Sequence, residues 1–175
     1  MKRTKQDEFL ALYEPIHNRF ERFCRARVYG EMDFRDVINE TLLIAFGKYD
    51  TLKSRESFLS FLFGIAVRVI GNQLQKKKTE RFQGEEEKYD REDQHTNPSE
   101  DADIHFLYQA LTKLIDEQRE AIILFELSGF SIKEIAALQG ASEAAVKQRL
   151  KRGREKLTQL LTYESTLKTG ENNHE

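Results

Sequence analysis

The 175 residues carry 28 basic and 30 acidic side chains, a formal net charge of −2, and the one cysteine excludes an internal disulfide or a cysteine-rich zinc site. This length is enough for one ordinary domain or two small ones. The N-terminus has no uninterrupted apolar core, so no signal peptide is predicted, and no run approaches the roughly 18 apolar residues of a membrane helix. We therefore expect no membrane insertion and a soluble, cytoplasmic protein.

The negative charge is concentrated in one segment, residues 83–103. This segment holds nine acidic and two basic residues, a net of −7, which leaves +5 on the remainder of the chain. It lacks hydrophobic periodicity and contains Pro98, and its like charges favour an extended chain. We predict a disordered acidic linker that leaves the relative placement of two more basic modules to a partner. Such a linker does not exclude nucleic-acid binding.

Before the linker, apolar residues recur at helical spacing in residues 7–28, 36–48 and 58–78. Pro15 interrupts the first pattern and predicts a kink or a helix start there. The third segment is too apolar for an exposed helix, so we expect it at the centre of a first domain, residues 5–82.

Helical patterns resume after the linker and define a second domain, residues 104–161. The tail, residues 162–175, shows no core-forming pattern and is predicted to be disordered. Few segments alternate apolar with polar residues, so the predicted fold is all-α, with two small helical domains joined by the flexible linker.

Residues 131–157 predict a helix-turn-helix. Ser131 and Glu134 have the spacing of a capping box, Gly140 supplies the turn, and Ser142 can cap the second helix. Apolar residues of the second helix fall on one side, and its other side is basic. Such a pair of helices is typical of proteins that read the DNA major groove. A surface helical hairpin with a solvated basic face is the alternative.

No enzyme signature is present: the chain has no glycine-rich phosphate loop, metalloprotease motif or nucleophile elbow. We expect no catalytic residue, cofactor or small-molecule substrate. The carboxylates of Asp36 and Glu40, four residues apart, have a spacing that could hold a divalent metal, but acids that are solvated or contact protein are more common, and no metal site is predicted. Cys24 is interpreted as a buried structural residue, with a reactive thiol as the alternative.

Three stretches together resemble the extracytoplasmic-function sigma factors of bacterial RNA polymerase. The stretches are DFRDVINETLLIAF (33–46) and FLSFLFGIAVRVIGNQL (58–74), both similar to parts of the family's region 2, and residues 110–157, similar to its region 4. Their order and spacing strengthen the match. The resemblance implies a subunit that binds core RNA polymerase and directs initiation at specific promoters, with promoter DNA and an anti-sigma factor as further partners.

The resemblance also implies site residues. Polymerase docking would use Asp36, Val37, Asn39, Glu40 and Leu43. The minus-35 element would be read by Lys147, Gln148, Lys151 and Arg152, with Arg154 suited to phosphates. The minus-10 element would be held by Arg68, Asn72, Gln75, Lys76 and Lys77, together with the loop 48–55. For the lysines, a solvated helix end is the alternative, since cations favour helix C-termini.

Several positions depart from the family pattern. Phe61 stands where tryptophan is common, Ile115 replaces a usual proline, Gly64 stands where arginine is frequent, and Arg68 occupies a position that is often asparagine. Because three of these positions lie on the helix that handles the minus-10 element, the promoter sequence is not inferred from relatives.

Two other functions are compatible with parts of the sequence. A stand-alone helix-turn-helix regulator would bind its operator without polymerase, usually as a symmetric dimer. An interaction protein would use the first module alone to occupy polymerase, but the basic recognition helix argues against it. A gel-shift with and without core polymerase separates the sigma factor from the regulator.

Overall fold

The computed structural model describes residues 4–83 and 102–171, and within them every regular element is a helix, as predicted. The first module contains α1 (Lys5–Tyr13), η1 (Glu14–Ile16), α2 (His17–Val28), α3 (Phe34–Gly47), η2 (Tyr49–Thr51), η3 (Arg55–Ser57) and α4 (Phe58–Gln83). The second contains α5 (Ala102–Leu111), α6 (Asp116–Ile122), η4 (Ile123–Leu127), α7 (Ile132–Gln139) and α8 (Glu143–Glu171). The predicted linker falls almost wholly outside the described residues.

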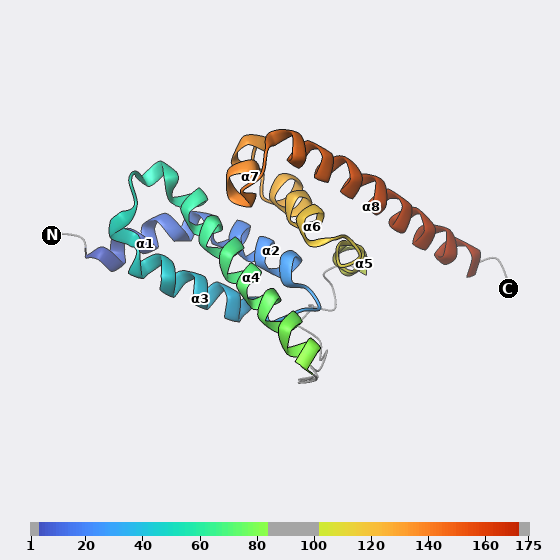
Figure 1. The fold of residues 1–175 in the computed structure, drawn as a ribbon, viewed down its shortest axis with the longest axis horizontal. Coiled ribbons are helices and arrows are strands. Elements are labelled where there is room, and N and C mark those ends of the chain that lie inside the picture. The colour runs from blue at the N-terminus through green and yellow to red at the C-terminus, as the bar shows by residue number, and fades with distance from the viewer. Residues whose placement is uncertain (1–3, 84–101, 172–175) are drawn as a thin grey trace.

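The first module is built around α4, which α2 and α3 flank (Figure 1). Its core is aromatic: the rings of Phe20 and Phe23 lie 5.2 and 4.9 Å from the ring of Phe63, centroid to centroid, and all three side chains are fully buried. Pro15 lies in η1, between α1 and α2, where a missing backbone N–H costs least. The predicted interruption of the first helix is therefore confirmed.

Helix α4 is more apolar than expected. A stretch around it, Arg55–Phe82, is long and apolar enough to cross a membrane by length and composition, with a mean hydropathy of 1.4 over its best window. Our expectation that no segment would approach such a composition was wrong, because Arg68 is the single charged residue between Phe58 and Gln75. Leu62, Phe63 and Ile70 are nevertheless fully buried, so α4 serves as the core helix of the first module.

The second module places the helix-turn-helix as predicted. Ser131 and Glu134 form the capping box, in which the Ser131 N–H donates to Glu134 Oε2 at 2.8 Å. Gly140 adopts the left-handed φ of 58° that ends α7, and the Ala141 N–H closes the turn onto the Ala136 carbonyl at 2.9 Å. These contacts are local in sequence, which is why the sequence predicts them.

Helix α8 packs across α6 at a glycine. A Cβ on Gly153 would lie 3.0 Å from Ile122 Cγ1, so the absence of a side chain allows the close approach of these two helices. Val146, Leu150 and Leu157 extend the same buried side of α8, which confirms the predicted apolar side.

The predicted disordered tail requires a correction. Helix α8 continues to Glu171, so residues 162–171 are helical. Between Leu157 and Gly170 the chain contains neither glycine nor proline, and nothing local ends the helix. Residues 172–175 lie outside the described residues.

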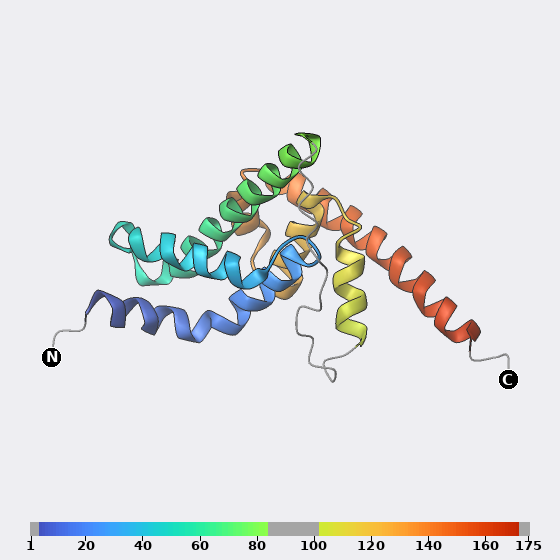
Figure 2. The ribbon, with the colours of Figure 1, turned by 90° about the horizontal axis from the view of Figure 1, so that it is seen from below.

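The two modules pack against each other. Helix α2 contacts η4, and α4 contacts α7, so the first module meets the second along two pairs of elements. Figures 1 and 2 show α6 and α7 beside α2 and α4, with α8 extending away from the first module. The relative placement that the sequence left open is thus a defined interface in this structure.

Candidate promoter and polymerase interfaces

The first turns of α8 present the basic face of the helix-turn-helix. Ser142 Oγ accepts a hydrogen bond from the Ala145 N–H at 3.1 Å and starts the helix. Val146, Leu150 and Gly153 are buried, and most of the side chains between them face solvent. The exposed side chains there include all four residues predicted to read bases, Lys147, Gln148, Lys151 and Arg152. Their donors are therefore available to the edges of bases in a major groove.

Arg154 lies on the same helix but is already engaged. Its Nε and Nη2 donate to Glu126 Oε1 at 2.9 and 2.7 Å. Its guanidinium also lies 5.2 Å from the centroid of the Phe125 ring. A phosphate contact by Arg154 would therefore have to compete with Glu126.

The predicted minus-10 residues lie along one side of α4. Arg68, Asn72, Gln75 and Lys76 are exposed, and their spacing of four, three and one residues places them on one broad helix face. Lys77 differs: it is half-buried, and its Nζ donates to the carbonyl of Glu31. Lys77 thus ties α4 to the loop after α2.

The loop 48–55, predicted to help hold a melted base, is fastened to α1. Lys5 Nζ lies 2.6 Å from Asp50 Oδ2, and Arg55 pairs with Glu8 at 3.9 Å. Both pairs are solvent-exposed and each contributes little to stability. The loop keeps Lys48 and Lys53 exposed beside the first module's core.

Helix α3 exposes an acidic and apolar face. Asp36, Asn39 and Glu40 are exposed, and Leu43 is 76% exposed, the largest value among the exposed Leu, Ile and Val side chains described. Val37, predicted with them, is fully buried, so it supports the helix from the core and does not reach the surface. Glu40 accepts a hydrogen bond from Gln73 of α4.

Neither metal nor thiol chemistry gains support. Within residues 4–83 and 102–171, no group of three or more His, Cys, Asp or Glu side chains is placed to hold a metal ion, so Asp36 and Glu40 have no third ligand there. Cys24 is fully buried, and desolvation raises the pKa of its thiol, with the Glu21 carboxylate adding to the effect. The burial of Cys24 and the raised pKa of its thiol both fit its interpretation as a structural residue.

Sequence reasoning missed three buried charged residues between the modules: Arg27, Arg119 and Glu120. Desolvation, and next the positive charge of Arg27, lower the pKa of Arg119 to about 10. The signal for Arg27 was its position, because it continues the apolar side of α2 formed by Phe20, Phe23 and Cys24. A charge on the buried side of an amphipathic helix indicates a polar partner.

Comparisons with known proteins match both modules. Residues 12–80 match the family model for Sigma-70 region 2, and residues 107–157 match that for Sigma-70, region 4. The chain is 32% identical over 128 residues to the ECF RNA polymerase sigma factor EcfG of Rhodopseudomonas palustris, covering 72% of this chain and 70% of the relative. It is 31% identical to the RNA polymerase sigma factor CarQ of Myxococcus xanthus, covering 89% and 90%. This chain is an ECF sigma factor.

The fold of this sigma factor is shared with solved relatives. The sigma factor RpoE in its complex with the anti-sigma factor NepR from Bartonella quintana superposes with a TM-score of 0.79 at 26% identity, covering 89% of this chain and 97% of that one. CnrH, solved with the cytosolic domain of CnrY, shares the fold with a TM-score of 0.67 at 24% identity, covering 90% of each chain. As an ECF sigma factor, the chain acts with core RNA polymerase and promoter DNA in promoter-specific transcription initiation.

Proposed function

We propose that this sigma factor reads the minus-35 element with the exposed face of α8 and the minus-10 element with α4 and the loop 48–55. The observation that carries the proposal is the set of exposed lysine, glutamine and arginine side chains between Val146 and Gly153. They lie on the second helix of the helix-turn-helix, whose first helix begins with a capping box. Arg152 or Lys151 suits guanine and Gln148 suits adenine, because these side chains match the groups that those bases expose in the major groove.

The proposed polymerase contact is the exposed face of α3. Asp36 and Glu40 suit a basic partner surface, and Leu43, about one turn after Glu40, suits an apolar one. The docking target would be a coiled coil of the largest polymerase subunit, as the family resemblance implies.

The same proposal includes the cellular role. The sigma factor would contribute no active site of its own, would act in the cytoplasm, and would be held inactive by an anti-sigma factor. The complex of the related sigma factor RpoE with the anti-sigma factor NepR supports this last point. The domain bounds proposed are 5–82 for the polymerase and minus-10 module and 104–161 for the minus-35 module.

The decisive experiment is transcription in vitro with purified core polymerase on fragmented genomic DNA. We expect specific run-off products that require the sigma factor. Leu43→Ser should weaken core binding about 5-fold or more, since truncating one of the few energetically important residues near the centre of an interface costs over about 1 kcal/mol. Leu10→Ser, which changes an exposed leucine on α1, is the matched control and should leave core binding unchanged. An intact protein that initiates from no promoter would exclude the sigma function.

A stand-alone helix-turn-helix regulator is not favoured. It would leave the exposed face of α3 without a role and would bind operator DNA tightly in the absence of polymerase. A gel-shift in which promoter binding is equally tight with and without core polymerase would support that alternative.

A further inference from the structure

The interface between the modules combines aromatic and basic contacts. The rings of Phe63 on α4 and Phe130 before α7 meet at 4.9 Å between centroids. Arg19 of α2 lies over the Phe130 ring at 5.2 Å and donates to the carbonyl of Ser128. Phe63 and Phe130 are buried, so this part of the interface is held chiefly by removal of apolar surface from water.

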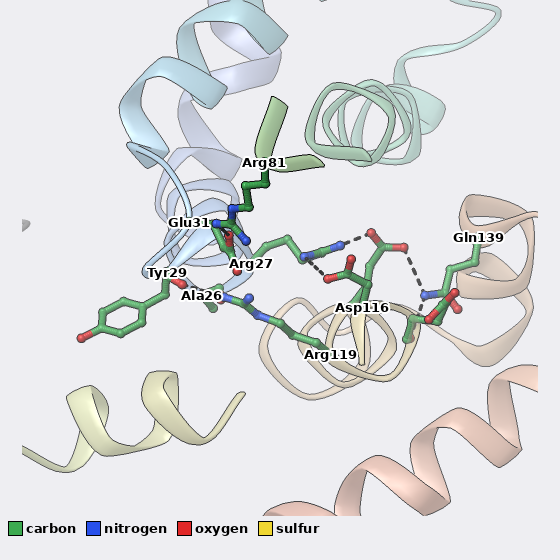
Figure 3. Close-up of polar contacts among 10 residues, drawn as sticks. Ala26, Arg27, Tyr29, Glu31, Arg81, Asp116, Arg119 and Gln139 are labelled. Atoms are coloured by element: carbon green, nitrogen blue, oxygen red, sulfur yellow. Dashed lines mark hydrogen bonds and ion pairs between the residues drawn. The ribbon is translucent and has the colours of Figure 1, made fainter. Parts of the chain in front are cut away.

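The same interface holds a cluster of ions in which Arg27 and Glu120 are buried and Asp116 is exposed (Figure 3). Arg27 of α2 pairs with Glu120 at 3.3 Å and Asp116 at 3.4 Å, both on α6, and the Arg27 side chain is only 4% exposed. In the opposite direction, Arg119 of α6 donates to the carbonyls of Ala26 and Tyr29 at 2.8 and 3.2 Å. Each module therefore sends one arginine into the other, and each arginine would lose its partners if the modules separated.

The ion cluster is linked to the recognition helix. Glu120 uses its second oxygen to accept a hydrogen bond from Gln139 Nε2 at 3.1 Å. Gln139 in turn accepts from Arg149 Nη1 of α8 at 2.8 Å. Glu120 thus connects Arg27 of the first module, the last residue of α7, and the base-reading helix.

This arrangement fixes the two DNA-reading surfaces close together. Leu138 Cδ2, in the last turn of α7, lies 3.6 Å from the position of a Cβ on Gly64, one turn before Arg68. The same turn holds α8 through Gln139 and Arg149. With α7 between α4 and α8, two successive helix spacings separate the surfaces by roughly 20 Å.

The promoter demands a much larger separation. The elements are named for positions about 35 and 10 base pairs before the start site, so they lie about 25 base pairs apart, or roughly 85 Å of duplex at about 3.4 Å per base pair. The packed arrangement therefore cannot contact both elements at once, and α7 also covers the start of the α4 face that carries Arg68. Promoter binding through both modules requires that the interface open.

We propose that the reciprocal ion cluster, Arg27 with Asp116 and Glu120 and Arg119 with the α2 carbonyls, is an autoinhibitory latch that holds the free chain closed. The proposal rests on the proposed division of promoter reading between α4 and α8. Closure lowers the fraction of chains competent to bind polymerase and promoter together, and the apparent affinity falls by that fraction. Gly64 contributes by leaving room for Leu138, so a long side chain there would work against closure.

The test is a charge exchange across the latch. Glu120→Arg places a third arginine beside Arg27 and Arg119, and we expect the free chain to expand, with a larger radius of gyration by small-angle X-ray scattering. Together with core polymerase, its affinity for a promoter fragment that carries both elements should rise about 5-fold or more. The double variant Arg27→Glu/Glu120→Arg re-forms an opposite-charge pair and should restore both the compact scattering profile and the lower affinity.

Two further variants keep the test decisive. Gly64→Arg should open the chain from the α7 side without touching the ions, and Arg22→Ala, which removes an exposed arginine from α2, should change neither readout. A folded Glu120→Arg protein with unchanged scattering, or a charge exchange that restores nothing, would overturn the latch. Absence of transcription from wild type and open variants alike would overturn the sigma function instead, while the scattering result would still decide the latch.

Discussion

Ile115 replaces a proline that is common in the family, and its backbone already has the conformation that a proline would adopt. It precedes α6 with φ −67° and ψ 152°, and the first value is the angle that a proline ring imposes. Its side chain is 61% exposed, so little packing depends on it. In the unfolded chain Ile115 can adopt many backbone conformations, and folding loses that entropy although the native φ is one that proline would impose.

Ile115→Pro should stabilise the protein by about 0.4–1 kcal/mol, because proline restricts the unfolded chain at a position whose native φ it already fits. For a chain of this size the melting temperature should rise by about 1–4 °C. Thermal unfolding followed by circular dichroism measures the change. A lower melting temperature would mean that the Ile115 side chain or its N–H matters more than its backbone.

Arg152 and Lys156 are both exposed on α8 but should differ in what they recognise. Arg152→Ala should weaken binding to the cognate minus-35 sequence by about 1–3 kcal/mol, roughly 5- to 150-fold, and should relax the preference at one base pair. Lys156 lies beyond the four positions predicted to read bases, so we assign it to a phosphate, and Lys156→Ala should weaken binding about equally on every sequence. Titrations of polymerase holoenzyme against promoters mutated at single minus-35 positions compare the two, and uniform loss for Arg152→Ala would contradict base reading.

Helices whose ends are set by nearby residues could be predicted from the sequence. The capping box of α7 joins residues three apart, and Gly140 needs only its own φ, so the helix-turn-helix follows from local chemistry. The π-helical η4 was not predicted, because nothing local distinguishes Ile123–Leu127 from an α-helix. In η4 the Ser128 N–H reaches back five residues to Ile123, and the Ser128 carbonyl faces Arg19, a partner in the other module.

Two helix glycines, one on α4 and one where α8 packs on α6, should respond in opposite ways to substitution by alanine. Gly71→Ala on α4 meets no atom within 4 Å and should stabilise the protein by about 0.5–1 kcal/mol, the usual helix preference for alanine. Gly153→Ala should destabilise it by about 1–2 kcal/mol, because overpacking against Ile122 outweighs that preference. Urea denaturation gives both values. Equal stabilisation by the two substitutions would show that α8 can move away from α6 at little cost.

At the scale of the whole molecule, the candidate site could be predicted only in part. Leu43 and Arg152 were predicted from the family resemblance, and both side chains are exposed in the structure. The partner of Arg27 could not be found in this way, since Glu120 lies 93 residues further along the chain and across the linker. A single sequence carries no signal for a pairing that exists only once two modules pack.

That pairing should make the two modules unfold together. The modules are small, near the size at which a domain buries only about 60% of its unfolded surface and is marginal alone. Each therefore depends on the shared contact of Phe63 with Phe130 and on the ions around Arg27. Calorimetry of the wild type should give one transition whose van't Hoff and calorimetric enthalpies agree.

Breaking the interface should separate the transitions. Glu120→Arg should give two overlapping transitions, at least one of them below the wild-type melting temperature, because each module then unfolds without the stabilisation that the other supplied. Arg22→Ala, on the same helix as Arg27 but exposed, should keep the single transition. Two transitions in the wild type would mean that the interface adds too little free energy to couple the modules. The closed arrangement would then be a minor influence on how this sigma factor reaches its promoter.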